Sequence, residues 1–241
     1  MRPERVKPVL LSSQNASVIF PDPEQADSNL IAVGGDLSRK RILQAYAQGI
    51  FPWFGEEDPI LWWSPDPRGV LEPRAIHISR SLLKNAKVAS WQVVLDQDFA
   101  AVMDECAAPR SGQGGTWITA EMRNAYLDLF AAGMAHCVEI FQHGQRVGGL
   151  YGVGLGAIFF GESMFSRVPD ASKIALVWLA RHLTHWGFGL IDTQFLTPHL
   201  QSMGASEIPR AEFLQLLTRL KAQATQGAWQ EFLPWEQIFW R

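Results

Sequence analysis

Alternating hydrophobic and polar positions are clearest in the second half of the chain, from residue 137 to residue 194. Turn residues at 143–144 and 154–156 separate three stretches with a period of two, which predict an antiparallel meander of strands at residues 137–141, 146–153 and 157–165. A helical pattern follows, and then a short apolar strand, at residues 171–186 and 189–194. Because a strand, a helix of this length and another strand form a crossover connection, the last two strands should be parallel, with a right-handed crossover.

Shorter patterns predict the remaining elements. Ser38 should cap a helix that Gly49 ends, and further helices are expected at residues 79–87, 99–107, 119–132, 198–203 and 210–223. Strands are expected at residues 17–20 and 91–95, loops at 21–35, 51–68 and 111–117, and an aromatic tail that packs back at 229–240. A boundary near residue 68 gives an α+β fold with a small N-terminal α/β domain (1–68) and a larger domain (69–241).

The segment from residue 51 to residue 68 holds three Trp and four Pro. Proline lacks the N–H that a helix needs, so this segment should be a stiff loop. Aromatic rings on such a loop form a rigid apolar platform, which suits stacking against a nucleobase.

Composition narrows the class of protein. Hydrophobic residues make up 47% and charged residues 19% of the 241 residues, which is typical of a folded protein. A net charge of −3 argues against a general nucleic-acid binder, so any nucleic acid would be met by a local patch and by stacking. No apolar run is long enough for a membrane span, and only Cys106 and Cys137 are present, so we expect a cytoplasmic protein without disulfides or metal.

Three polar side chains stand among the apolar strands. Glu162 lies within a strand-like run where an unpaired charge is costly, so it should have a partner or a task. Asp192 and Gln194 are two residues apart and should share one face of their strand. A parallel neighbour would bring Glu162, Met164 and Ser166 close to them, near the carboxyl ends of the strands. An acid and an amide beside an apolar slot suit aminolysis of an acyl ester; the open alternative is that Asp192 and Gln194 only cap a helix or bond to backbone.

The order meander, helix, strand and short helix resembles the acyl-CoA N-acyltransferase fold. Proteins with that fold bind the pyrophosphate at a Gly-rich loop between the fourth strand and the next helix. The corresponding junction here, residues 166–173, contains no Gly, although Arg167 and Lys173 could still meet a phosphate. This difference disfavours CoA as the acyl donor.

A set of motifs then identifies a family. In chain order they are FPWF (51–54), LWWSPDPR (61–68), HISRS (77–81), GTWIT (115–119), GGLYG (148–152), GESMFSR (161–167), LIDTQ (190–194), MGA (203–205) and EIPR (207–210). Together they resemble the bacterial leucyl/phenylalanyl-tRNA–protein transferases over nearly the whole chain, from about residue 15 to 235. The resemblance implies transfer of Leu or Phe, and less readily Met, from charged tRNA to proteins that begin with Arg or Lys. The products enter N-degron proteolysis.

The resemblance also implies roles for particular residues. The 3′-terminal adenosine should stack between Trp53 and Trp117. Asp192 and Gln194 should act in catalysis on the acceptor α-amine, with Glu162 reading the cationic side chain of the acceptor. The donor side chain should enter a hydrophobic pocket formed by Leu150, Ile158, Phe159, Met164, Ser166, Leu176, Leu179 and Ile191. Strand parity puts Ile158 and Phe159 on opposite faces, so a bulge or an edge position is needed if both line it.

The body of the tRNA should bind a basic surface on the helix after His77. Arg80, Lys84 and Lys87 lie on this helix and Arg74 lies nearby, although a merely solvated helix face would carry similar charges. The expected enzyme needs no cofactor. Two alternatives stay open: a CoA-dependent N-acyltransferase, and a non-catalytic module that binds charged tRNA ends or protein N-termini.

Overall fold

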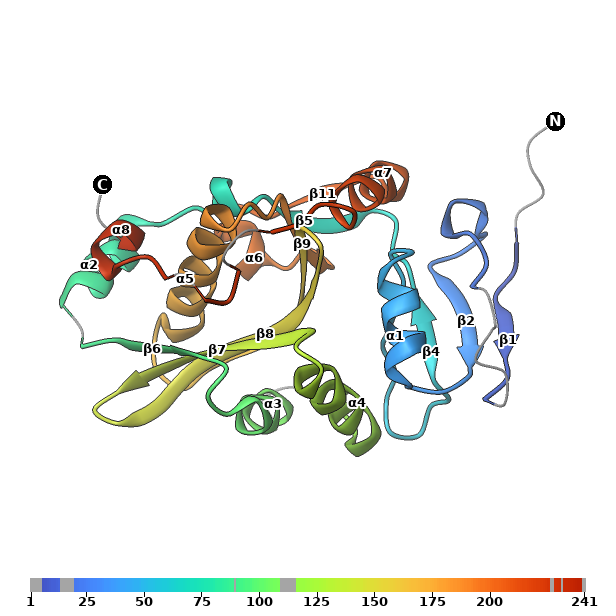
Figure 1. The fold of residues 1–241 in the computed structure, drawn as a ribbon, viewed down its shortest axis with the longest axis horizontal. Coiled ribbons are helices and arrows are strands. Elements are labelled where there is room, and N and C mark those ends of the chain that lie inside the picture. The colour runs from blue at the N-terminus through green and yellow to red at the C-terminus, as the bar shows by residue number, and fades with distance from the viewer. Residues whose placement is uncertain are drawn as a thin grey trace.

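The computed structural model describes residues 6–13, 20–88, 90–108, 116–225, 228–230 and 232–239. The chain forms a mixed α/β structure with two sheets (Figure 1). The smaller sheet has the order β1 (Val9–Leu11), β2 (Leu30–Gly34), β4 (Leu61–Trp63) and β3 (Phe51–Pro52). The larger sheet has the order β11 (Ser206–Ile208), β5 (Arg68–Leu71), β10 (Leu190–Gln194), β9 (Ile158–Ser166), β8 (Gln145–Leu155), β7 (Ala135–Gln142) and β6 (Gln92–Leu95).

The predicted meander and parallel pair are present in the larger sheet. Strands β7, β8 and β9 pair antiparallel in chain order, and β10 pairs parallel to β9. Helix α5 (Ala171–His185) makes the crossover between β9 and β10. Strand β10 also pairs antiparallel with β5, so β5 and β11 extend the sheet beyond the parallel pair.

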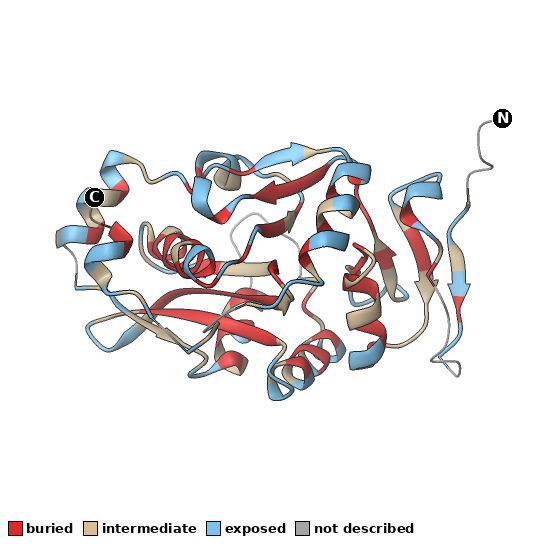
Figure 2. Cartoon of the chain, turned by 45° about the horizontal axis from the view of Figure 1, so that its top comes forward, coloured by how far each residue is buried: buried red, intermediate tan, exposed pale blue. Residues whose placement is uncertain are grey.

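Helices cover both faces of the larger sheet (Figure 1). Helix α5 packs on one face, whereas α3 (Phe99–Ala107) and α4 (Ala120–Ala131) pack on the other. Two buried apolar clusters result, one on each face, and β7, β8 and α5 are mostly buried (Figure 2). Ile158 belongs to the cluster that includes α3 and α4, and Phe159 to the cluster around α5, as strand alternation requires.

The remaining helices pack at several places around the two sheets. Helix α1 (Arg39–Tyr46) packs beside β3 and α4, and the predicted N-cap Ser38 makes no side-chain hydrogen bond to the helix. The other helices are α2 (Arg80–Val88), α6 (Pro198–Ser202), α7 (Arg210–Leu220) and α8 (Trp235–Phe239), with 3-10 turns at Pro23–Gln25 and Pro73–Ala75. The aromatic tail packs back as predicted, since Ile238 and Phe239 are buried and the Trp229 ring stacks on His136 at 3.7 Å.

The N-terminal region is where the sequence predictions were wrong. The predicted loop at 21–35 contains β2, and the predicted loop at 51–68 contains the short strands β3 and β4. These strands are only two to five residues long, so they give little periodicity. Residues 17–19 of the predicted strand at 17–20 and most of the predicted loop at 111–117 lie outside the described residues, and Phe20 is not in a strand. The domain boundary at residue 68 stays a prediction.

Both cysteines are free and buried, in agreement with the expected absence of a disulfide. Within the described ranges, no helix is both long and apolar enough to cross a membrane.

Candidate functional site

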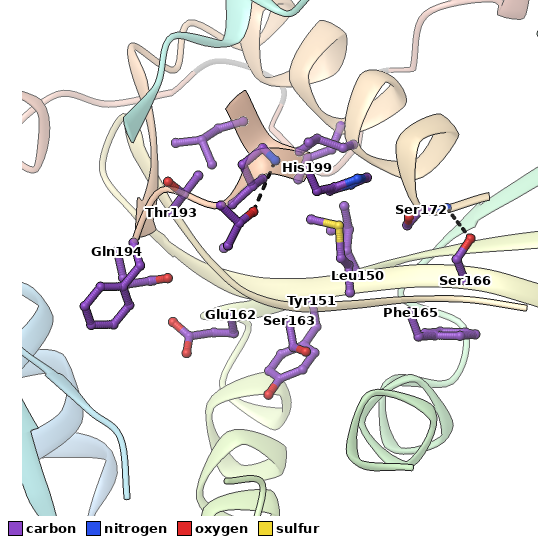
Figure 3. A pocket seen from close by; sticks show the side chains of 18 of the residues that line it. Leu150, Tyr151, Glu162, Ser163, Phe165, Ser166, Ser172, Thr193, Gln194 and His199 are labelled. Atoms are coloured by element: carbon purple, nitrogen blue, oxygen red, sulfur yellow. Dashed lines mark hydrogen bonds between the residues drawn. The ribbon is translucent and has the colours of Figure 1, made fainter. Parts of the chain in front are cut away.

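A cavity of about 770 Å³ opens where β8, β9 and β10 meet α5, α6 and the segment 51–53 of the smaller sheet (Figure 3). Glu162 and Gln194, on the neighbouring strands β9 and β10, lie at the same end of the cavity, whereas Phe165 and Ser166 lie at its other end (Figure 3). The carboxyl end of β10 therefore contributes to the cavity, as expected for an α/β sheet.

Most of the residues predicted for a donor pocket line this cavity. They come from β8, β9, α5 and β10, and they are Leu150, Phe159, Met164, Ser166, Leu176, Leu179 and Ile191. Ile158 does not line it: this residue is fully buried on the opposite face of β9, because no bulge separates it from Phe159. The placement of Ile158 in the pocket was therefore wrong, and alternation along the strand is the reason.

Strand β10 presents its residues differently from the prediction. Ile191 and Thr193 line the cavity, whereas Asp192 is fully buried and does not. The register shifts between Asp192 and Gln194, and Gln194 has a φ of 56°, so its side chain turns into the cavity. Asp192 and Gln194 consequently do not share a face, because this irregularity breaks the alternation of the strand.

Asp192 contacts Arg68 instead of the cavity. Arg68 donates from Nε and Nη2 to the two carboxylate oxygens at 2.8 and 2.6 Å, and both side chains are fully buried. Oδ1 of Asp192 also accepts from the backbone N–H of Gln194 at 2.9 Å. Asp192 therefore fixes the backbone at Gln194 from behind the cavity wall.

Glu162 has the partners that its position required. The hydroxyl of Tyr46 lies 2.6 Å from one of its carboxyl oxygens and the hydroxyl of Tyr126 lies 3.0 Å from the other. Burial raises the pKa of Glu162 to about 7, and the negative charge of Asp192 adds to this; the tyrosine hydrogen bonds and Arg68 act in the opposite direction. A carboxyl group with this pKa exchanges a proton near neutral pH.

Trp53 and Trp117 both line the cavity. Trp53 is 43% exposed, and its ring lies 5.7 Å from that of Phe195, which is similarly exposed. Trp117 is half-buried and lies just before α4. Exposed aromatic faces at an otherwise apolar cavity are suited to stacking with a flat ligand.

Three buried polar atoms of the cavity wall have no hydrogen-bond partner within the described part of the chain: Thr193 Oγ1, Gln194 Nε2 and His199 Nε2. Buried polar atoms are usually satisfied, so these three are free to bond with a ligand. Burial also lowers the pKa of His199, which keeps its imidazole neutral near pH 7.

The basic residues predicted to bind tRNA lie away from the cavity. Arg80, Lys84 and Lys87 are exposed on α2, and Arg74 is exposed on the preceding 3-10 turn, where it pairs with Glu72 at 3.2 Å. None of the four lines the cavity.

The junction between β9 and α5 does not resemble a diphosphate loop. Arg167 pairs with Glu105, and Lys173 pairs with Asp170 at 3.1 Å, so both cations have carboxylate partners. Ser166 Oγ accepts from the backbone N–H of Ser172 at 3.2 Å, which occupies part of the loop. Across the described residues, no group of three His, Cys, Asp or Glu side chains is arranged to hold a metal ion.

Sequence reasoning missed Arg68, Tyr46 and Tyr126. Arg68 is 124 residues from Asp192, and Tyr46 is 116 residues from Glu162, so no local pattern links them. Only the unexplained charge of Glu162 signalled that a polar partner was needed.

Comparisons with known proteins agree on one family. A sequence model described as "Leucyl/phenylalanyl-tRNA protein transferase" matches residues 70–218, and one described as its N-terminal domain matches residues 35–66. A protein of Thiobacillus denitrificans named "Leucyl/phenylalanyl-tRNA--protein transferase" is 57% identical over 209 residues, which cover 86% of this chain and 91% of that protein. One of the same name from Myxococcus xanthus is 52% identical over 227 residues, which cover 93% of this chain and 97% of that protein.

Similarity to solved structures is weaker. "The structure of L-PGS from Bacillus licheniformis" aligns with 71% of this chain and 57% of that chain at 10% identity, with a TM-score of 0.39, which is too low to support an argument. The sequence relatives alone show the family of this chain. This chain belongs to the leucyl/phenylalanyl-tRNA–protein transferase family, whose members transfer Leu or Phe from an aminoacyl-tRNA to a protein.

Proposed function

We propose that this enzyme transfers Leu or Phe, and less readily Met, from charged tRNA(Leu) or tRNA(Phe) to proteins whose N-terminal residue is Arg or Lys, without a metal or a cofactor. The observation that carries this proposal is the single cavity that combines an apolar wall, two tryptophans, and the polar pair Gln194 and Glu162. Each part corresponds to one part of the two substrates.

The aminoacyl end of the tRNA occupies the cavity. The donor side chain fits the apolar wall, where the flexible Met164 accommodates Leu, Phe and Met. The 3′-terminal adenine stacks against Trp53 and Trp117, because unpaired RNA ends are recognised by aromatic stacking. The exposed cations Arg74, Arg80, Lys84 and Lys87 on and near α2 attract the tRNA backbone at a distance from the cavity.

Catalysis requires a neutral α-amine directed at the ester carbonyl. The pKa of an α-amino group is about 7.7–8.0, so positioning and modest proton acceptance are sufficient near neutral pH. Gln194 orients the amine from the end of β10. Asp192 does not reach the cavity, and its contact with the Gln194 backbone makes it a positioning residue for Gln194. Glu162 reads the cationic side chain of the acceptor.

The larger sheet with its crossover helix has the layout of an N-acyltransferase-like fold, which we propose for this part of the chain. A CoA-dependent N-acyltransferase is the second candidate for the activity. It is disfavoured because Arg167 and Lys173, the cations at the expected pyrophosphate loop, are paired with Glu105 and Asp170.

The test is a transfer assay with radiolabelled Phe-tRNA or Leu-tRNA and a model protein that begins with Arg, Lys or Ala. New peptide bonds on the Arg and Lys proteins, and few on the Ala protein, support the proposal. Binding of charged tRNA with an intact ester identifies a non-catalytic module instead. Acylation from phenylalanyl-CoA but not from Phe-tRNA supports the second candidate.

A further inference from the structure

Three oxygen-bearing side chains from three elements meet where Glu162 on β9 lines the cavity, with Tyr46 on α1 and Tyr126 on α4 behind it. Tyr46 Oη lies 2.6 Å from Glu162 Oε1, and Tyr126 Oη lies 3.0 Å from Glu162 Oε2. The two phenol oxygens are 2.5 Å apart, and both tyrosines are fully buried. The three groups therefore form a closed triangle in which every edge has the length of a hydrogen bond.

Three edges need three protons, one on each. Burial raises the pKa values of Tyr46 and Tyr126 well above 10, and the neighbouring Glu162 adds to this, so the phenols together supply two protons. If Glu162 were ionised, one edge would join two oxygens with no proton between them. If Glu162 is protonated, each group donates once and accepts once, and all edges are satisfied.

The surroundings of Glu162 favour the neutral acid. Tyr151 on β8 lies beneath Tyr126, with ring centroids 5.8 Å apart, and Asp192 on β10 is the second carboxylate near Glu162. Arg68 on β5 is the nearby cation, but the carboxylate of Asp192 binds it directly. The raised pKa of Glu162 agrees with this balance of charges.

We propose that Tyr46 and Tyr126 close a ring of three hydrogen bonds around a protonated Glu162, and that a cationic acceptor N-terminus binds at Glu162 by displacing this proton. The second part rests on the function proposed above, whereas the first part does not. On binding, the O–H bond of Glu162 breaks, the proton passes to solvent, and the carboxylate pairs with the incoming guanidinium or ammonium group. Tyr46 and Tyr126 are thus positioning residues that set the protonation of Glu162.

The ring predicts a sign that distinguishes it from simple donation. If both phenols only donate to a carboxylate, replacing either with Phe removes a donor and raises the pKa of Glu162. In the closed ring, the same replacement removes two of the three hydrogen bonds of the neutral form but only one hydrogen bond of the ionised form, which had left one edge unsatisfied. The pKa of Glu162 then falls in both Tyr46→Phe and Tyr126→Phe.

The first experiment titrates the ligand-free full chain by infrared difference spectroscopy and follows the C=O stretch of protonated carboxyl groups, with Glu162→Gln to assign the band. A band that titrates near pH 7 in the wild type, and about one pH unit lower in each Phe variant, supports the ring. Tyr151→Phe is the matched control, because its buried hydroxyl has no hydrogen-bond partner in the described chain, so the midpoint should not move. A higher midpoint in the Phe variants, or full ionisation of wild-type Glu162 by roughly pH 5, overturns the ring.

Both Phe variants keep the buried rings, so the contact of residue 46 with Phe160 and that of residue 126 with Tyr151 are retained. If one of them still fails to fold, the other variant and the wild-type titration decide the question. The midpoint in the wild type alone separates a neutral acid from a carboxylate.

The second experiment measures the KM for an acceptor protein that begins with Arg, at several pH values, in the wild type and in Tyr126→Phe. In the wild type, the KM should decrease as the pH rises toward the pKa of Glu162, by up to about tenfold per pH unit. In Tyr126→Phe, this pH-dependent part of the KM profile should move to lower pH. Titration of the acceptor amine is common to both proteins and cancels in the comparison. Identical KM profiles overturn the displacement step. Absence of transfer at every pH, with the infrared result unchanged, overturns the proposed function but leaves the ring in place.

Discussion

Arg68 and Asp192 form a bidentate ion pair in which neither side chain has exposed surface, with N–O distances of 2.8 and 2.6 Å. Arg68 also donates from Nη1 to the carbonyl of Gly49 at 3.0 Å, and Asp192 accepts from the Gln194 backbone. This one pair therefore connects the turn after α1, the start of β5 and the cavity end of β10. It holds the backbone of Gln194 in a left-handed conformation that a non-glycine residue rarely adopts.

Removing one partner of this pair should destabilise the fold as well as the site. Asp192→Asn keeps the shape but leaves a buried, uncompensated guanidinium, which costs about 3–5 kcal/mol of unfolding free energy. The measurement is urea denaturation, together with transfer from Phe-tRNA at a temperature where the variant is folded. The double variant Arg68→Met/Asp192→Leu should recover much of the stability but not the activity. Transfer at the wild-type rate by folded Asp192→Ala would reject Asp192 as a positioning residue.

The two tryptophans of the cavity should contribute mainly to tRNA affinity. Replacing Trp53 or Trp117 with Ala removes a stacking face worth about 1–3 kcal/mol per base, a roughly 5- to 150-fold weaker Kd for the charged tRNA end. A short acceptor-stem mimic that carries Phe is the suitable ligand, because it lacks contacts with α2. Trp53→Phe keeps an aromatic face and should lose less affinity than Trp53→Ala. Equal losses in both would contradict stacking at this position.

The large elements of the fold could be predicted because their signals are local. The meander and α5 are long apolar segments of 8 to 15 residues between turn residues, and the Thr119 side chain caps α4 by accepting a hydrogen bond from the N–H of Met122. The strands of the smaller sheet could not be predicted, because β3 has two residues and is held by its pairing with β4. Such strands exist only through contacts that a sequence window does not contain.

The features of the functional site also divide into those that the sequence could predict and those that it could not. The cavity position of Glu162 and Gln194 could be expected from the family motifs, and an apolar wall from strand parity. The placement of Asp192 could not, because it depends on an irregularity of β10 and on Arg68 from another strand. Ile158 illustrates the opposite case, since strict alternation alone excludes it from the cavity.

The apolar wall should determine which amino acid is transferred. Leu176→Phe puts a larger side chain into the cavity and leaves less room for the donor. It should reduce transfer of Phe more than transfer of Leu, because about one methylene of misfit in such a pocket changes kcat/KM by roughly 10- to 200-fold. The readout is the ratio of Phe to Leu transfer under competition. Ile158→Val is the matched control: it lies on the other face of β9, so it should lower stability by about 0.5–1.5 kcal/mol without changing that ratio. A changed ratio in Ile158→Val would place this residue back in the pocket.

The exposed cations of α2 should act through the tRNA backbone. Arg80→Ala and Lys84→Ala should weaken binding of every tRNA to a similar extent and reduce the slope of log Kd against log salt by roughly 0.7–0.9 per lost contact. Filter binding of full-length tRNA from low to moderate salt measures this slope. Arg219→Ala removes an exposed cation from α7, far from α2, and should leave the slope unchanged (Figure 1). An unchanged slope after loss of both Arg80 and Lys84 would reject α2 as the tRNA surface.

The raised pKa of Glu162 should appear in the pH dependence of stability. The pKa is about 7 in the folded chain against an ordinary 4.5, so the unfolded chain ionises first as the pH rises. Unfolding therefore releases a proton between about pH 4.5 and pH 7, and stability falls across this window by up to about 3 kcal/mol. Glu162→Gln resembles the neutral acid, since its amide both donates and accepts, but it cannot ionise.

The variant and the wild type should consequently be equally stable near pH 4.5, and Glu162→Gln should be the more stable of the two at pH 8. Urea denaturation at fixed ionic strength, across this pH range, measures the difference. The same variant should lose acceptor binding, because a neutral amide cannot pair with a guanidinium or ammonium group as a carboxylate does. Stability that is gained at high pH while acceptor KM rises is the signature of a residue kept ionisable for function. Parallel stability curves for the two proteins would instead mean that Glu162 is already charged in the folded chain at low pH.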